Sequence, residues 1–121
     1  MVNLLYVFLG GGAGSVLRYL TGKMLSSQSF PYATLLANLL ACLLAGLLIG
    51  IANSKTGMSQ WIKLSLLTGF CGGLSTFSAF SYETMHMLMQ GKPISAMLNI
   101  GLNIFLGFLL FFVCYKGMFQ R

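Results

Sequence analysis

Long apolar runs, interrupted by short polar segments, organise the whole chain. Four runs have about the length of 20 residues that an α-helix needs to cross a bilayer. They cover residues 3–20, 33–52, 61–89 and 94–116. The segments between them carry the Ser, Gly, Pro, Asn and Lys that are typical of turns. The pattern predicts an all-α protein with four transmembrane helices, in a single transmembrane domain over residues 1–121.

The composition indicates that the bilayer, and not water, surrounds the protein. Hydrophobic residues make up 57% of the chain and charged residues 7%, whereas soluble domains carry typically about 25% charged residues. The basic residues occur singly between apolar runs, where they would meet lipid headgroups. A nucleic-acid-binding face needs them clustered on one surface. We therefore expect contact with membrane lipid and no nucleic-acid partner.

The basic residues also predict how the chain inserts. With four spans, one side of the membrane carries Lys55, Lys63, Lys116 and Arg121, and the other carries Arg18, Lys23 and Lys92. Lys and Arg in short loops set orientation, and four against three is almost no bias. The count favours insertion in both orientations, as in proteins that assemble as antiparallel pairs. One fixed orientation is the alternative.

The third run has an unusual centre. Residues 69–78 read Gly-Phe-Cys-Gly-Gly-Leu-Ser-Thr-Phe-Ser, with three glycines and three hydroxyl groups in the middle of the membrane. One interpretation is close helix packing through Gly69 and Gly73. The other is a helix broken at mid-membrane, which presents free carbonyl and N–H groups to an ion.

The candidate chemistry favours anion transport over catalysis. The only acid, Glu83, and the only histidine, His86, lie three residues apart near the end of the third span, and neither a second acid nor a nucleophile-and-base set accompanies them. The polar residues within the spans are neutral: Asn38, Ser75, Thr76, Ser78, Ser81, Asn99 and Asn103. Proton-coupled and cation pathways need intramembrane carboxylates, whereas neutral donors suit an anion. Hydrogen bonds between helices are the alternative role for these side chains.

Two phenylalanines follow the glycines. Phe77 and Phe80 lie on nearly one face of a helix, and a phenyl ring has a positive edge that can face an anion. Ring packing is the alternative.

At these residues the chain resembles the Fluc (CrcB) family of bacterial fluoride channels. Residues 11–19 look like the family's first-helix signature of glycines followed by an arginine. Residues 31–38 look like its P-x-G-T-L-x-x-N motif, and residues 69–80 like G-x-x-G-G-x-T-T-F-S-T-F. The three motifs occur in order along essentially the whole chain.

The resemblance implies a fluoride-selective passive channel that exports F⁻ from the cytoplasm across the cell membrane. A four-span chain is too short to form a conduction pathway alone. The resemblance accordingly implies an antiparallel, dual-topology dimer with two pores. A structural Na⁺ at its centre would be bound by main-chain carbonyls of Gly72 and Ser75.

The resemblance also implies roles along the fluoride pathway. Phe77 and Phe80 would line the pore, and Asn38 would offer its amide N–H to fluoride. Ser78 and Ser81 would continue a polar track. The roles implied for Arg18 and Thr76 are vestibule electrostatics or structure.

Some positions depart from the family pattern: Ala33, Ser75 and Ala79 in the motifs, and Asn99 and Asn103 in the fourth span. Such departures would suit one subunit of a heterodimeric channel. A second alternative is a small multidrug-resistance type exchanger, which needs an acid in its first helix, and residues 3–20 contain none. A third is an accessory tetraspan subunit, which would transport nothing by itself.

Overall fold

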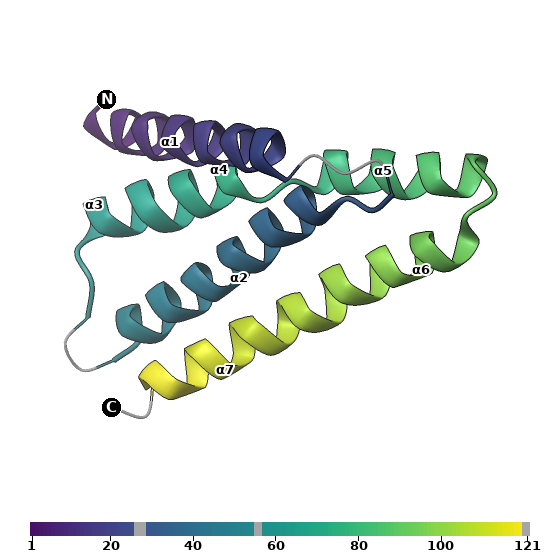
Figure 1. Ribbon diagram of the computed structural model, residues 1–121. Helices are drawn as coiled ribbons and strands as arrows, with labels where there is room; N and C mark the ends of the chain where they lie inside the picture. Colours follow the sequence, from purple (N-terminus) through teal and green to yellow (C-terminus); the bar gives the residue numbers. More distant parts are fainter. Residues whose placement is uncertain (26–28, 55–56, 120–121) are drawn as a thin grey trace.

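The computed structural model describes residues 1–25, 29–54 and 57–119, which form helices joined by short turns (Figure 1). Four helical spans are long and apolar enough to cross a membrane: Val2–Met24, Tyr32–Ala52, Gln60–Met89 and Pro93–Met118. The all-α, four-span prediction is therefore confirmed. The first span runs further than the expected 3–20, because the helix continues through the polar residues before Met24.

The third and fourth spans are composite. In chain order the helices are α1 (Val2–Met24), α2 (Tyr32–Ala52), α3 (Gln60–Ile62), the π-helical stretch η1 (Lys63–Cys71), α4 (Gly72–Leu74), α5 (Phe77–Met89), α6 (Pro93–Gly101), the π-helical stretch η2 (Leu102–Leu106) and α7 (Gly107–Phe119). The third span thus comprises α3, η1, α4 and α5, and the fourth comprises α6, η2 and α7.

Glycines bring the first span into close contact with the first half of the third. A Cβ atom on Gly14 would overlap the Phe70 carbonyl oxygen, and one on Gly73 would overlap the Gly11 carbonyl oxygen. A Cβ on Gly69 would lie 2.9 Å from the Val7 carbonyl oxygen. Backbone therefore packs on backbone, as small residues permit in membrane helices. The packing interpretation of Gly69 and Gly73 is confirmed.

This packing gives a first prediction. Replacing Gly14 with Ala should destabilise the purified protein by about 1–3 kcal/mol, because the added methyl group forces α1 away from rigid backbone. The melting temperature in detergent measures the effect. Gly22→Ala is the matched control on the same helix, because open space surrounds Gly22 and alanine favours a helix by about 1 kcal/mol over glycine. Equal melting temperatures for the two variants would contradict the packing.

A similar contact joins the second and fourth spans, since α2 packs along α7. Gly46 and Gly50 approach the backbone at Phe111 and Tyr115. Small side chains of α2, including Ala37 and Ala41, meet Cys71 and Leu74 of the third span in a buried apolar cluster. These contacts hold α1, α2, η1, α4 and α7 in one bundle.

The third span is broken near its middle, between α4 and α5. Ser75 has φ −72° and ψ 153°, and Thr76 has φ −150° and ψ 112°, so both residues are extended. The break therefore falls just after the glycine pair, which remains helical in α4. Glycine packing and a helix break, the two interpretations of this stretch, both hold at different residues.

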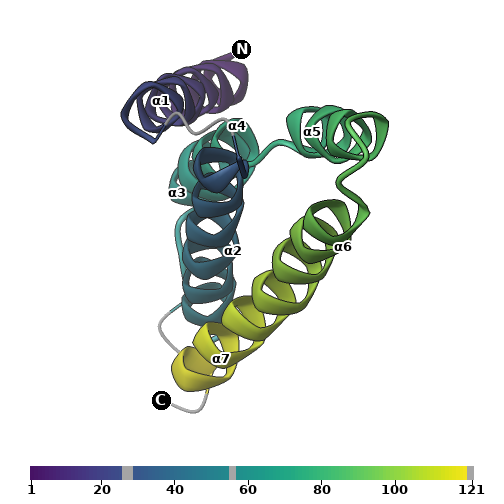
Figure 2. The same ribbon diagram turned by 45° about the vertical axis from the view of Figure 1, so that its right-hand side comes forward.

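Beyond the break, α5 turns back into α6 through a tight cap. Lys92 N–H donates to the Met87 carbonyl and Gly91 N–H to the Leu88 carbonyl, which is a Schellman motif. Gly91 has φ +71°, a conformation that favours glycine. Pro93 then occupies the first turn of α6, where its missing N–H costs nothing. The resulting α5–α6 pair lies to the right of α2 in Figure 2, and a hydrogen bond between Thr34 and Glu83 joins α5 to α2.

Candidate functional site

The helix break is held open by a side chain from the second span. The Thr76 N–H donates to Asn38 Oδ1 over 2.8 Å, instead of to the carbonyl four residues earlier as in a continuous helix. The Thr76 hydroxyl accepts from the Ala79 N–H over 3.2 Å and so caps α5. Asn38 and Thr76 together satisfy backbone donors that the break would otherwise leave bare in the membrane.

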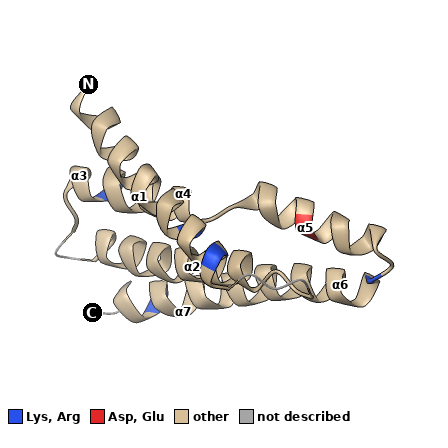
Figure 3. Ribbon diagram, turned by 45° about the horizontal axis from the view of Figure 1, so that its top comes forward, with Lys and Arg blue, Asp and Glu red and all other residues tan. Residues whose placement is uncertain are grey.

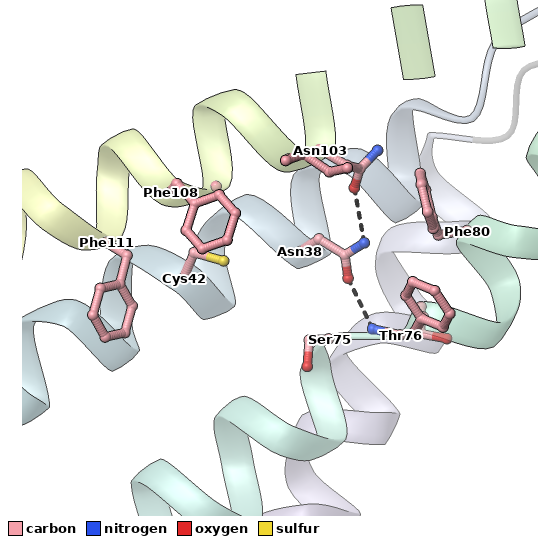
Figure 4. Close-up of a pocket in the computed structure, with 11 residues that line it drawn as sticks. Asn38, Cys42, Ser75, Thr76, Phe80, Asn103, Phe108 and Phe111 are labelled. Carbon is pink, nitrogen blue, oxygen red and sulfur yellow. Dashed lines mark hydrogen bonds between the residues drawn. The ribbon is translucent and has the colours of Figure 1, made fainter. Parts of the chain in front are cut away.

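A cavity of about 450 Å³ opens beside the break (Figure 4). Asn38, Asn103 and Thr76 give it a polar end, and the rings of Phe80, Phe108 and other residues line the rest. Asn38 Nδ2 donates to Asn103 Oδ1 over 2.8 Å, so the second and fourth spans are linked at the cavity wall. The cavity therefore combines amide groups with an aromatic lining.

Both predicted pore phenylalanines line this cavity. Their ring centroids are 5.7 Å apart with planes tilted by 45°. Phe80 is 9% exposed and Phe77 is 80% exposed. Phe80 is thus part of the wall that the single chain builds, while Phe77 reaches its outer edge.

The two predicted polar-track serines lie on the exposed part of α5. Ser78 Oγ is 3.3 Å from Thr76 Oγ1, and the Ser81 hydroxyl donates to the Phe77 carbonyl over 2.8 Å. The cavity-lining residues include Thr76 and Phe77 but neither serine. The role predicted for Ser78 and Ser81 stays a prediction.

The predicted cation ligands are the first residue of α4, Gly72, and the residue that directly follows this helix, Ser75. Gly72 is exposed, and a Cβ there would meet no atom within 4 Å. Because the Thr76 N–H is directed to Asn38, the Gly72 carbonyl loses its usual helical donor. Within the described residues there is no group of three or more His, Cys, Asp or Glu that could hold a metal.

Arg18 lies on α1, outside the set of cavity-lining residues. The Thr21 hydroxyl donates to the Arg18 carbonyl over 2.8 Å, and the residue is partly exposed. The structure thus gives Arg18 a place at the carboxyl-terminal part of the first span, apart from the cavity.

Of the fourth-span asparagines, whose role the sequence left open, Asn103 lies in the cavity wall and Asn99 lies behind it. Asn103 lines the cavity, and its Nδ2 donates to both the main-chain and the side-chain oxygen of Asn99 over 2.9 Å. Asn99 is fully buried and donates to Thr84 on α5 over 2.9 Å. Their spacing of four residues was the available signal, since such residues stack on a helix. Their expected alternative role, hydrogen bonding between helices, is confirmed.

Glu83 and His86, three residues apart near the end of the third span, have separate surroundings. Glu83 Oε1 accepts from the Thr34 hydroxyl over 2.6 Å, and Glu83 Oε2 is buried without a partner among the described residues. His86 is exposed, stacks on Tyr82 and approaches Gln90 Nε2 to 2.8 Å. The Glu83 carboxylate faces α2 because α5, after the break, passes close to Thr34.

Residues 5–115 match the profile of a protein family described as CrcB-like protein, Camphor Resistance (CrcB). The chain belongs to the CrcB family. It is a multi-pass membrane protein, with four spans within the part that the structure describes.

Relatives of the CrcB chain align with it over most of its length. A fluoride-specific ion channel, FluC, of Flavobacterium psychrophilum is 44% identical over 110 residues, which cover 88% of this chain and 89% of the relative. A fluoride-specific ion channel, FluC, of Pyrococcus furiosus is 47% identical over 112 residues, covering 86% and 91%. A protein of the same description from Klebsiella pneumoniae is 42% identical over 100 residues, covering 81% and 79%.

Proposed function

We propose that this chain is the subunit of a fluoride-selective passive channel that exports F⁻ from the cytoplasm, and is not an enzyme. The observation that carries the proposal is the alignment of nearly the whole chain with fluoride-specific ion channels at 44% and 47% identity. The cavity at the helix break supplies the chemistry that such a channel needs.

The cavity wall offers donors and ring edges to a small anion. Asn38 Nδ2 makes one hydrogen bond within the described residues, which leaves its second N–H for a ligand. Phe80 and Phe77 would turn their positive edges to the ion where water is missing. The cavity-lining residues are uncharged. An anion therefore meets no carboxylate that would repel it and no cation that would bind it too tightly to leave.

The incomplete cover of the cavity supports assembly as a dimer. Phe77, beside the break in the middle of the third span, is 80% exposed in the single chain. A second copy in antiparallel orientation would cover this edge and give two pores, one for each chain. The near-equal distribution of basic residues supports insertion in both orientations.

A structural Na⁺ fits the region around α4. Gly72 and Ser75 would bind it through their main-chain carbonyls, and the open space over Gly72 would let a second copy approach. Because the ligands are main-chain oxygens, Ser75 serves as well as the threonine of the family motif. The ion would fix the break regions of two subunits together.

Two alternatives remain distinct from this proposal. A proton-coupled exchanger would use an acid in the first span, which has none. A heterodimeric fluoride channel would use this chain as one of two different subunits.

Flux from liposomes that contain only this protein tests the function. We expect the protein to dissipate an F⁻ gradient and to give no detectable Cl⁻ efflux, because the neutral, aromatic-lined path selects a small anion. Ion-selective electrodes follow both anions from matched vesicles. Comparable F⁻ and Cl⁻ efflux would contradict selectivity, and F⁻ flux that appears only with a second subunit type would establish the heterodimer.

A further inference from the structure

A continuous series of hydrogen bonds runs from the helix break into the fourth span. The Thr76 N–H donates to Asn38 Oδ1, and Asn38 Nδ2 donates to Asn103 Oδ1, each over 2.8 Å (Figure 4). Asn103 Nδ2 then donates to Asn99 Oδ1 over 2.9 Å. Three spans are connected by these bonds alone.

The series returns to the third span beyond the break. Asn99 Nδ2 donates to Thr84 Oγ1 over 2.9 Å, and the Thr84 hydroxyl donates to the Phe80 carbonyl over 2.7 Å. The polar chain therefore begins at the break and ends on the backbone of a pore phenylalanine. Asn99 is 0% exposed and Thr84 is 8% exposed, so water does not replace a lost bond here.

The direction of every bond is fixed by the backbone at the two ends. The Thr76 N–H can only donate, so Asn38 must turn its oxygen to it and its NH₂ group to Asn103. The Phe80 carbonyl can only accept, so the Thr84 hydroxyl must donate to it and accept from Asn99. Turning over one amide would set oxygen against oxygen or N–H against N–H in a buried site, which is costly.

We propose that Asn99 and Thr84 are positioning residues that hold the amide of Asn38 with an N–H, and not its oxygen, available to the cavity. They do so without contacting the ion, through Asn103. This inference rests on the proposed function and extends it to a buried layer behind the cavity wall. The layer also ties Phe80 to Asn38, so that the ring and the amide keep one relative position.

Removing the hydrogen bond between Asn99 and Thr84 should therefore change the side-chain amide of Asn38. Thr84→Val keeps the shape but leaves Asn99 Nδ2 without an acceptor. We expect a shift of the Asn38 side-chain amide resonances in ¹⁵N-labelled protein and F⁻ efflux lowered about tenfold, as for loss of a buried hydrogen-bond partner. Thr84→Ser retains the hydroxyl and should restore both. Thr68→Val, the same change at an exposed position of η1, should alter neither.

A double-mutant cycle separates one coupled chain from two independent structural effects. Asn99→Leu alone should also lower efflux about tenfold, and Asn99→Leu/Thr84→Val should lower it no further than the worse single variant. The proposal would be overturned if the double variant lowered efflux by the product of the two single reductions. It would also be overturned if the Asn38 resonances did not move in Thr84→Val. If Thr84→Val does not fold, Thr84→Ala against Thr84→Ser gives the same comparison. The Asn38 resonances are measured without ion flux. A parent protein that conducts no F⁻ would therefore contradict the proposed function but not the positioning role of Asn99 and Thr84.

Discussion

Replacing Phe80 with Ile should lower fluoride efflux at least about tenfold, because isoleucine has no ring and therefore no positive edge to offer an anion. Phe80 is 9% exposed, lines the cavity and lies against Phe77. Isoleucine keeps much of the apolar bulk, so the fold should lose only about 1–2 kcal/mol. Efflux from liposomes measures the effect, and size-exclusion chromatography verifies that the assembly persists.

The matched control makes the same chemical change away from the cavity. Phe8 lies on α1 and is 74% exposed, so Phe8→Ile should conduct like the parent. If Phe80→Ile also conducts like the parent, the two rings serve packing and the proposed pathway through them is wrong. Reduced efflux with an equally reduced assembled fraction would point to folding, which the chromatography separates from conduction.

The helices could be predicted because their causes are local. Apolar runs of bilayer length, Pro31 before α2 and Pro93 at the start of α6 mark spans and turns directly in the sequence. The sequence predicted a break within residues 69–78 but not its position, which is at Ser75 and Thr76 and not at the glycines. The reason is tertiary: Gly73 is held in the helix by backbone contact with Gly11, and Thr76 caps the next helix.

The polar wall of the cavity could not be predicted, because it depends on contacts between distant residues. Asn38 and Asn103 are separated by 65 positions, and their hydrogen bond exists only once α2 and η2 lie together. The sequence identified both as neutral intramembrane side chains but could not pair them. Glu83 illustrates the same limit, since its bond to Thr34 arises from the direction that α5 takes after the break.

The second large effect concerns orientation in the membrane. Figure 3 shows Lys and Arg at the end with α3 and α7, midway along the molecule near the carboxyl end of α1, and at the turn before α6. Two of the residues in the four-against-three count, Lys55 and Arg121, lie outside the described residues. Each basic residue near the surface contributes about 1 kcal/mol, so the two orientations are nearly equal in energy. A small change in charge should therefore redistribute the whole population.

Adding two lysines beside the second loop should abolish function in a homodimer. Asn53 and Ser59 flank Lys55 and are exposed, and Asn53→Lys/Ser59→Lys adds about 2 kcal/mol, or roughly a thirtyfold preference, for a cytoplasmic second loop. An antiparallel pair cannot form from subunits that share one orientation. Survival of a fluoride-sensitive host should therefore fall, and cysteine labelling from outside the cell reports the orientation.

A copy biased the opposite way should restore survival. Met89 and Gln90 are exposed at the end of α5, beside Lys92, and Met89→Lys/Gln90→Lys favours a cytoplasmic third loop. Each biased copy should fail alone, and the two together should protect the host, since co-expression supplies both orientations. Full protection by either copy alone, with its orientation verified by labelling, would show that a parallel assembly functions. If the unmodified chain protects the host only beside a different natural subunit, that subunit supplies the opposite orientation and the channel is a heterodimer.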